Sequence, residues 1–286
     1  MHLYIGTAGF SYPDWRGIVY PKDVKKRYGH ELRYLARYLD LCEINTSFYG
    51  PLKPKDAKAW CDHVSDVNPD FLFTAKLTNV FTHAKEAKTT SSSVETIKYT
   101  QKDVDEAKAG FEPMMDTGRL GAVLAQFPIS FKFKEKKEGG EADPLYGNWD
   151  HVLDVLNLFK EYSLGVEFRD ASWDNEWVLK ELAERKVAFC NVDQPRLGNS
   201  LDGTEYVTAP FAYLRLHGRN YDKWFTAKNR DERYDFLYMG ERLDRVKKRA
   251  EQMSQKAMKT FVVANNHPKG QAPANALQLK KMLTGK

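Results

Sequence analysis

The sequence predicts an α/β fold, a single (β/α)8 TIM barrel that occupies residues 1–286 as one domain. Short apolar or β-branched runs occur eight times, and most of them are separated by stretches with helical periodicity. Strands that alternate with helices form parallel sheets, and eight such strands in 286 residues suit a closed barrel. An open doubly wound sheet is the alternative, but it normally carries a phosphate fingerprint after a strand, and neither GxGxxG nor GxxxxGK(S/T) occurs.

The expected elements follow one another along the chain. The strands are Leu3–Thr7, Leu41–Tyr49, Phe71–Leu77, Gly121–Phe127, Leu164–Arg169, Val187–Asp193, Phe211–His217 and Thr260–Asn266. The helices contain Leu32, Leu35 and Leu39; Val94, Ile97, Val104, Ala107 and Phe111 after a Ser93 N-cap; Val152, Leu153, Leu156 and Phe159; Val178 and Leu182; Glu241–Met258; and Ala276, Leu279 and Met282 after Pro273.

Two segments interrupt this alternation. Between Asp193 and Phe211 the chain is rich in turn-forming residues, which predicts that the sixth crossover helix is short or missing. The segment from Phe131 to Gly147 is rich in lysine, glutamate and glycine, which is typical of a mobile surface loop. A nucleic-acid-binding tract is the alternative there, but the mixture of charge signs favours a solvated loop.

Composition excludes several classes of protein. The apolar fraction of 42% is enough for a sizeable core, which excludes wholesale disorder. The net charge of +5 permits an anionic partner without requiring one. The three cysteines lie far apart without a CxxC pair, which excludes a disulfide framework and a zinc ribbon. Because no signal-peptide pattern and no membrane-length apolar run occurs, we expect a cytoplasmic protein without membrane contact.

Polar residues occupy strands that should be apolar on both faces in a parallel sheet. In the fifth strand Glu167 and Arg169 share one face, because side chains alternate along a strand. With the apolar face against the helices, this polar pair lies inside the barrel near its C-terminal rim. The same alternation predicts that Glu43, Asn45, Asn191, Asp193, Arg215 and His217 point inward, while Cys42, Ile44, Cys190, Val192, Leu214 and Leu216 point outward. Other polar residues close strands at the same rim, namely Lys76, Gln126, Asn265, Asn266 and His267.

This polar rim has two interpretations. Barrel enzymes place their chemistry at the C-terminal ends of the strands, so a rim with many polar groups indicates a binding or active site. The alternative is a structural ion network, in which every buried charge needs a partner. If the rim binds an anion, Arg215 and Lys76 are expected to direct their donors into open space, with Glu43 and Glu167 held by other side chains.

Motifs spread over nearly the whole chain resemble the YecE-like family, catalogued as domain of unknown function 72. They are Ile5–Tyr12 with Trp15-Arg16-Gly17 and Tyr20-Pro21, Glu43–Tyr49, Lys76 with Thr82-His83, Gln126-Phe127-Pro128, Glu167-Phe168-Arg169 with Ser172-Trp173, Arg215–Arg219 with Trp224, and Asn265-Asn266-His267 with Gly270–Pro273. Ala264, where the family more often has an aromatic residue, and Ala8-Gly9-Phe10 depart from the family pattern. The resemblance implies a TIM barrel, in agreement with the strand count, and no established activity.

We expect no cofactor, although a divalent metal is left open. The family is similar in architecture to endonuclease IV and xylose isomerase-like enzymes, which use metal clusters. Here the candidate ligands are His83, His217 and His267 with Glu43, Glu167 and Asp193. No HxH or HExxH spacing occurs, and the rim cations Lys76, Arg169 and Arg215 would repel a metal ion.

Three functions fit the rim. The first is an enzyme that acts on a sugar phosphate or nucleic-acid backbone by acid/base chemistry, with Glu43, Glu167, Asp193 and His217 as catalytic groups. Its substrate would be bound by Asn45, Lys76, Gln126, Arg169, Trp173, Arg215, Arg219, Asn265, Asn266 and His267. The second is a nucleic-acid-binding module without turnover that uses the rim and the basic run 245–249. The third is a glycosidase with paired carboxylates.

The aromatic residues near the rim have two readings as well. Tyr12, Trp15, Tyr49, Trp173 and Trp224 could stack on a sugar or a nucleobase. Alternatively, both tryptophans have purely structural roles, in which Trp173 caps the fifth helix and Trp15 covers the end of the barrel.

Overall fold

The computed structural model describes residues 2–83, 97–133, 147–224, 226–227 and 231–285, and it contains a closed parallel barrel. The strands are β1 (His2–Ala8), β2 (Leu41–Ile44), β3 (Leu72–Lys76), β4 (Leu120–Gln126), β5 (Leu164–Glu167), β6 (Ala188–Asp193), β7 (Phe211–Leu216) and β8 (Lys259–Ala264). They pair in chain order, and β8 pairs back to β1 to close the barrel. The predicted barrel is therefore confirmed, and the open sheet is excluded.

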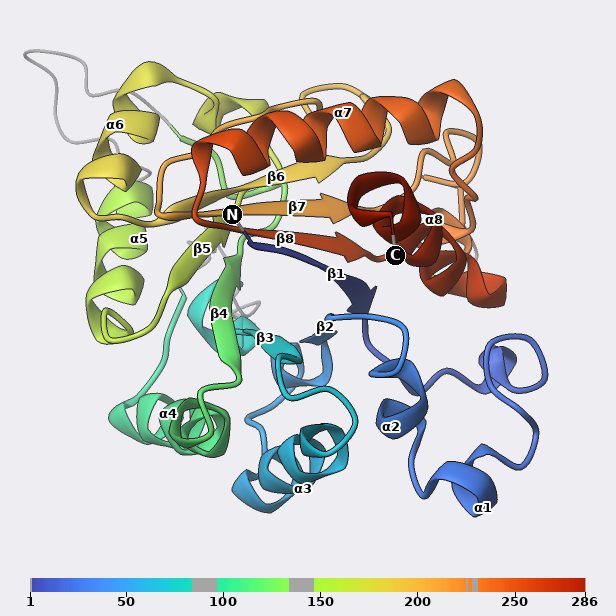
Figure 1. Ribbon diagram of the computed structural model, residues 1–286. Coiled ribbons are helices and arrows are strands. Elements are labelled where there is room, and N and C mark those ends of the chain that lie inside the picture. The colour runs from blue at the N-terminus through green and yellow to red at the C-terminus, as the bar shows by residue number, and fades with distance from the viewer. Residues whose placement is uncertain (1, 84–96, 134–146, 225, 228–230, 286) are drawn as a thin grey trace, which may run out of the picture.

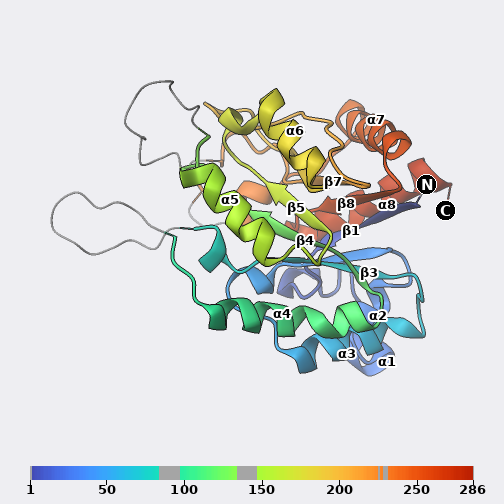
Figure 2. The same ribbon diagram turned by 90° about the vertical axis from the view of Figure 1, so that its left-hand side faces the viewer.

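Helices surround this barrel. They are α1 (Val24–Tyr28), α2 (Glu31–Leu35), α3 (Pro54–Ser65), α4 (Gln101–Asp116), α5 (Gly147–Leu158), α6 (Glu176–Glu184), α7 (Glu241–Lys256) and α8 (Gln271–Thr284). The arrows of β6, β7, β8 and β1 point the same way in Figure 1, and α3 to α7 are arranged around the strands in Figure 2. Within the described parts of the chain, no helix is both long and apolar enough to cross a membrane.

Short 3₁₀ turns follow several strands and shape the C-terminal mouth of the barrel. They are η1 (Pro13–Trp15), η2 (Thr46–Phe48), η3 (Asn79–Phe81), η5 (Ala171–Trp173), η6 (Asp231–Tyr234) and η7 (Pro268–Gly270). The second strand ends at Ile44, so the predicted run to Tyr49 is too long, and η2 occupies its second half.

Apolar side chains pack on both sides of the barrel wall. One cluster consists of strand residues only and fills the interior: Ala8, Leu41, Leu72, Ala122, Leu124, Ala188, Cys190, Phe211, Tyr213, Phe261 and Val263. The strands approach closely at Gly6, where an added Cβ would lie 1.7 Å from the carbonyl oxygen of Leu41. The predicted alternation holds on β2, β5 and β7, since Ile44, Phe168 and Leu214 all pack among helix residues.

The sixth crossover contains no helix, as predicted. All of residues 194–210 are described, and none of them lies in a helix or a strand. The loop instead runs against β6, where Tyr206 donates its backbone N–H to Asn191 Oδ1 at 2.8 Å and Thr208 Oγ1 accepts from the Phe189 backbone N–H. The outer face of β6 is therefore covered by polar loop backbone as well as by side chains.

Two helix starts differ from the sequence predictions. The fourth helix begins at Gln101, because Thr100 and Asp103 form a capping box there. Ile97 precedes this helix, while Ser93, Val94 and most of the charged segment 131–147 lie outside the described residues. The last helix begins at Gln271, which places Pro273 in its first turn, where the missing N–H costs no hydrogen bond.

Candidate functional site

A buried ion cluster fills the C-terminal end of the barrel. Arg215 on β7 lies between two carboxylates: its Nη2 is 2.5 Å from Glu43 Oε1, and its Nη1 binds Glu167 Oε2. The Tyr213 hydroxyl donates to Glu43 Oε2 at 2.7 Å and also contacts Thr74 Oγ1 at 2.7 Å. Glu43, Glu167 and Arg215 are at most 1% exposed. The predicted alternation on β2, β5 and β7 therefore brings these three charges together.

Arg169 extends the cluster towards the sixth crossover. Its Nε lies 2.5 Å from Glu167 Oε1, and its Nη1 donates to Gln194 Oε1 at 3.1 Å. Burial raises the pKa of Glu167, but the charges of Arg169 and Arg215 outweigh burial and hold that pKa well below its usual range. The side chain of Arg169 is 14% exposed, so this guanidinium reaches from the buried carboxylate towards the surface.

His217 joins the cluster to the cavity described below. Its Nε2 faces Glu167 Oε1 at 3.4 Å, and its Nδ1 lies 2.9 Å from Asn265 Nδ2. Burial and the charge of Arg169 lower the pKa of His217 to about 3, so the ring is neutral at physiological pH. In the neutral ring that fits these contacts, Nδ1 accepts from Asn265 and Nε2 carries the proton towards Glu167.

Lys76 ends β3 beside this cluster. It is 3% exposed, and its Nζ lies 4.5 Å from the centre of the Phe48 ring. Burial, followed by the charges of Arg215 and Arg169, lowers the pKa of Lys76 to about 7 against the opposing effect of Glu43 and Glu167. Burial and the charges of Lys76 and Arg169 also lower the pKa of the nearby His83 to about 4.

A cavity of about 290 Å³ opens at the same end of the barrel. It is lined by Gly9, Phe10, Ser11, Tyr12, Ile44, Asn45, Thr46, Tyr49, Trp60, Asp231, Tyr234, Asn265 and His267. The His267 ring stacks on Tyr12 with centroids 4.5 Å apart, and His267 Nε2 lies 3.1 Å from Asp231 Oδ1. Asn265 connects the two parts of the site, because it lines the cavity and contacts His217.

Comparison with known proteins places this chain in a family. Residues 4–286 match the family described as protein of unknown function DUF72. The chain belongs to the DUF72 family. The UPF0759 protein YunF of Bacillus subtilis (strain 168) is 24% identical over 291 residues, which cover 98% of this chain and 94% of that protein.

Two solved structures share the architecture of this DUF72 protein. A DUF72 family protein (TM1631) from Thermotoga maritima MSB8 is 33% identical, with 99% of each chain covered and a TM-score of 0.77. A DUF72 family protein (EF0366) from Enterococcus faecalis V583 is 23% identical, with 98% of this chain and 95% of that chain covered and a TM-score of 0.76. The second likeness shows the fold alone. The family description names no activity.

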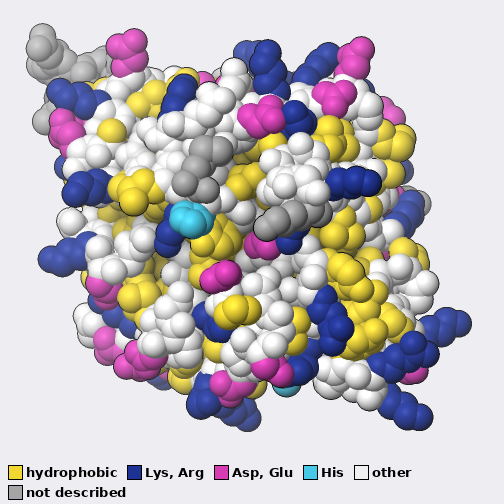
Figure 3. Space-filling model, viewed as in Figure 1, with side chains coloured by type: hydrophobic (Ala, Val, Ile, Leu, Met, Phe, Trp, Pro, Cys, Tyr) yellow, Lys and Arg dark blue, Asp and Glu magenta, His cyan; other side chains and the backbone are white. Residues whose placement is uncertain are grey.

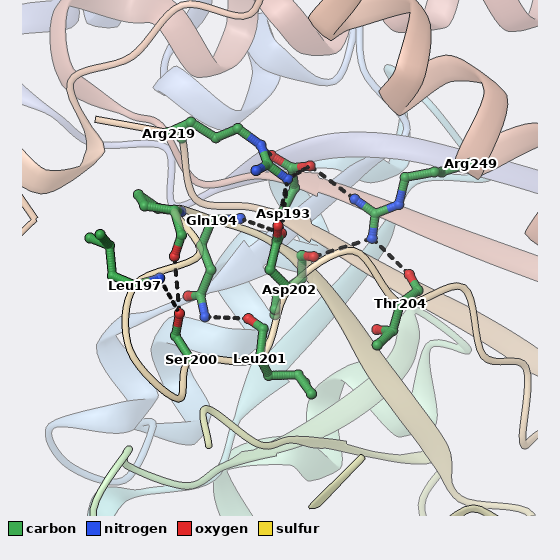
Figure 4. A network of polar contacts seen from close by, with 12 residues as sticks. Asp193, Gln194, Leu197, Ser200, Leu201, Asp202, Thr204, Arg219 and Arg249 are labelled. Carbon is green, nitrogen blue, oxygen red and sulfur yellow. Dashed lines mark hydrogen bonds and ion pairs between the residues drawn. The ribbon is translucent and has the colours of Figure 1, made fainter. Parts of the chain in front are cut away.

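Asp193 does not join the ion cluster of this DUF72 protein, contrary to the prediction. Its carboxylate accepts from Arg219 and Arg249, and Figure 4 shows both guanidinium groups pointing at it. The Tyr238 hydroxyl donates to the same carboxylate at 2.7 Å. In the β6–β7 register Asp193 pairs with Leu216, whose side chain packs outside the barrel. Arg219, predicted to bind substrate, is instead held by Asp193 and Asp202.

The alternation predicted for β6 was wrong at Cys190, Asn191 and Asp193. Asn191 bonds to the backbone of the sixth-crossover loop, and Cys190 lies inside the barrel with its Sγ 3.9 Å from Glu167 Oε2. The prediction assumed that the outer face of every strand meets an apolar helix. The loop and Arg249 cover this face instead, and their polar groups are satisfied by Asn191 and Asp193.

Three predicted binding residues have structural partners. Trp173 is fully buried, stacks on Phe168 with centroids 4.0 Å apart and donates its indole N–H to the Phe131 carbonyl oxygen. Asn266 turns towards α8, where its Nδ2 donates to Asn275 Oδ1 at 2.9 Å. Arg215 does not direct donors into open space, because both of its terminal nitrogens bind carboxylates.

The remaining predicted residues keep positions at the mouth. Asn45, Asn265 and His267 line the cavity, and Gln126 is half-buried at the end of β4. Trp15 is fully buried and donates its indole N–H to the His267 carbonyl oxygen, so it covers the end of the barrel.

Sequence reasoning missed Tyr213 and Asp231. Tyr213 could have been found, since it lies two residues before Arg215 on the same face of β7. Asp231 follows no strand, and its approach to His267 depends on the path of a loop.

The candidate metal ligands do not converge. Among the described residues, no three His, Cys, Asp or Glu side chains gather closely enough to hold a metal ion. His217 and Glu167 are neighbours, but His83 lies beside Lys76 and Asp193 faces α7.

Proposed function

We propose that this DUF72 protein is an enzyme that acts on a small anionic substrate at the C-terminal mouth by acid/base chemistry. The observation that carries this proposal is the charge of the buried cluster, in which Lys76, Arg169 and Arg215 outnumber Glu43 and Glu167. Arg215 is bound to both carboxylates. The surplus positive charge therefore lies on Lys76 and Arg169.

Both of these cations keep donors for a ligand. Among the described residues no acceptor binds the Lys76 ammonium, and Arg169 uses its Nε and Nη1 but not its Nη2. A guanidinium edge and an ammonium suit the oxygens of a phosphate or a carboxylate. A bound anion would also balance the surplus charge, which is costly in a buried setting.

The cavity favours a small substrate such as a sugar phosphate over a nucleic-acid strand. A volume of about 290 Å³ with aromatic walls fits one sugar ring, and we place the uncharged part of the substrate there. The basic run 245–249 on α7 offers a nucleic acid fewer free positive charges than its sequence indicates, because Arg249 is buried against Asp193 and Lys247 pairs with Glu251. On the face drawn in Figure 3, Lys and Arg are interspersed with Asp and Glu.

We assign proton transfer to groups that reach the mouth or the cavity. Lys76, with a pKa of about 7, exchanges a proton readily near neutral pH, and His267 is paired with Asp231 at the cavity wall. Glu43, Glu167 and His217 are fully buried, so we assign them the role of positioning residues for Arg169, Lys76 and Asn265.

Calorimetric titration with inorganic phosphate, glycerol 3-phosphate, glucose 6-phosphate and a twelve-nucleotide single strand tests this proposal. Arg169→Gln should weaken phosphate-ester binding about 10- to 100-fold, the value of a hydrogen bond to a charged group. Arg169→Lys should retain part of the affinity, and Lys180→Gln on the exposed face of α6 should retain all of it.

The outcomes of this titration are distinct. Phosphate-ester binding that depends on Arg169 supports the proposal. Absence of binding to all three phosphates, or binding of the oligonucleotide alone, overturns it. A chelator should leave binding unchanged, because the proposed donors are side chains. A cytoplasmic location, which we also propose, is supported by three free and buried cysteines.

A further inference from the structure

The ammonium of Lys76 is unusual among the buried charges of this protein. Each buried carboxylate and guanidinium of the cluster binds an opposite charge within 2.9 Å, as the contacts of Glu43, Glu167 and Arg215 show. Lys76 Nζ instead rests against the face of Phe48, and within the described parts of the chain it makes no hydrogen bond or ion pair. A buried amine without an acceptor loses solvation as a cation and gains little in return.

The groups around Lys76 come from three other strands or their C-terminal ends and from one turn. Glu43 lies on β2, Glu167 and Arg169 lie at the end of β5, Arg215 lies on β7, and His83 follows η3. Both carboxylates are committed to Arg215, so two guanidinium groups oppose the charge of Lys76 while neither carboxylate pairs with it directly. The geometry therefore makes the ammonium easy to deprotonate near neutral pH, and the pKa of about 7 agrees, so the ammonium and the neutral amine are both present at pH 7.

We propose that Lys76 is a nucleophile that forms an imine with the carbonyl carbon of an anionic substrate, such as an open-chain sugar phosphate or a 2-oxo acid. This inference rests on the proposed function, because it takes the anion bound by Arg169 as the group that holds the carbonyl near Lys76. A desolvated lysine next to other cations is a recognised route to an activated amine.

The step balances without an oxidant or a cofactor. The lone pair of the neutral amine forms the C–N bond while the π pair of the carbonyl moves to oxygen. A proton passes from nitrogen to that oxygen to give the carbinolamine. A second proton, taken from solvent, converts the hydroxyl into water, which leaves as the nitrogen lone pair forms the C=N⁺ bond. The iminium ion that results carries one positive charge, like the protonated form of Lys76, and Glu43 and Glu167 lie near enough to stabilise it.

Reductive trapping tests the inference. The protein is incubated at pH 7 with glycolaldehyde phosphate, pyruvate or neutral glycolaldehyde in the presence of cyanoborohydride, and the adducts are located by peptide mass mapping. At this pH about half of Lys76 is neutral, whereas a lysine with an ordinary pKa near 10.4 is neutral in about one molecule in 2,500. Labelling of Lys76 by the two anionic probes should exceed labelling of the exposed Lys180 by at least about 100-fold.

Matched variants separate nucleophilicity from charge and folding. Lys76→Arg keeps the positive charge without a nucleophilic amine, and it should lose the adduct while keeping its circular dichroism spectrum. Glycerol 3-phosphate, which has no carbonyl group, should slow labelling of Lys76 in the parent protein.

The two proposals fail in different ways. If phosphate esters bind in an Arg169-dependent manner but Lys76 is labelled no faster than Lys180, the imine is refuted and the anion site stands. If Lys76 is labelled equally by neutral and anionic probes and no phosphate binds, the anion site fails, and the substrate class proposed for the imine fails with it.

Discussion

Replacing Arg215 with Met tests the view that this residue holds the barrel together rather than binding a ligand. Methionine roughly preserves the apolar bulk of the side chain but removes the guanidinium that joins Glu43 to Glu167. Glu167 keeps Arg169, whose Nε is 2.5 Å away, whereas the carboxylate of Glu43 keeps, among the described residues, only the hydroxyl of Tyr213 as a hydrogen-bond partner. The variant therefore strands one fully buried carboxylate.

Stranding a buried charge costs about 3 to 5 kcal/mol of unfolding free energy. At about 2 °C per kcal/mol for a chain of this size, the melting temperature should fall by about 6 to 10 °C. Adding Glu43→Gln removes the stranded charge, so the double variant should recover about 1 to 3 kcal/mol, the range of coupling between residues in direct contact.

The loss of unfolding free energy in Arg215→Met should depend on pH. The pKa of Glu167 is depressed in the folded protein, so the stability it contributes is present above its unfolded pKa of about 4.3 and is lost as pH falls below that value. Without Arg215 the variant has less of this stability to lose, so the gap between parent and variant should narrow as the pH falls below about 4.3.

Urea unfolding followed by circular dichroism at pH 7 and at pH 3 measures these differences. Arg245→Met is the control, because this exposed residue pairs with Glu241 on the surface of α7 and its loss should change little. A loss below about 1 kcal/mol for Arg215→Met, or a double variant no more stable than the single one, would refute the structural role of the bridge.

Three further predictions follow from buried groups. Because the pKa of Lys76 is lowered to about 7, chiefly by burial, the unfolded chain binds more protons than the folded chain between about pH 7 and 10.4, so the unfolding free energy should rise with pH in this window. Lys76→Met should remove that rise, and equal slopes for variant and parent between pH 7 and 9 would contradict the placement of the amine. Asp193→Asn should lower the unfolding free energy by about 3 to 5 kcal/mol, since two arginines lose a buried counter-charge, with phosphate binding unchanged within twofold. A loss of phosphate binding without a loss of unfolding free energy would instead indicate that Asp193 belongs to the binding site. The three buried thiols should react with a disulfide reagent only in denaturant, because burial raises the pKa of each; a fast-reacting thiol in the folded protein would speak against this arrangement.

Local rules predicted the fold and much of the ion cluster. A closed barrel follows from eight strands that alternate with helices, and this needs no long-range information. On β5 and β7 the apolar face of each strand is unambiguous, because Val166, Phe168, Leu214 and Leu216 meet the outer layer of the core. The opposite parity then placed Glu167 and Arg215 inside the barrel.

The same rule failed on β6 because its premise failed there. A strand covered by a helix on its outer face needs apolar residues on that face, but β6 is covered by a loop whose backbone needs hydrogen-bond partners. Asn191 supplies such partners, Asp193 binds Arg219 and Arg249, and the small Cys190 faces the interior instead. The missing helix was predicted, yet its consequence for the polarity of β6 depends on where the loop docks, which local sequence does not determine.

The sequence left open whether the polar rim is a structural network or a reactive site, and under the proposed function one arrangement serves both. Arg215 engages Glu43 and Glu167 so closely that neither carboxylate is left to pair with Lys76. A carboxylate whose charge was not offset by Arg215 would favour the protonated amine at neutral pH. The ion bridge that stabilises the interior therefore also leaves the adjacent lysine without a counter-charge. It follows that Arg215→Met should alter Lys76 as well: loss of the nearby guanidinium charge would raise the pKa of the amine, and labelling of Lys76 in the trapping experiment at pH 7 should slow even in molecules that remain folded.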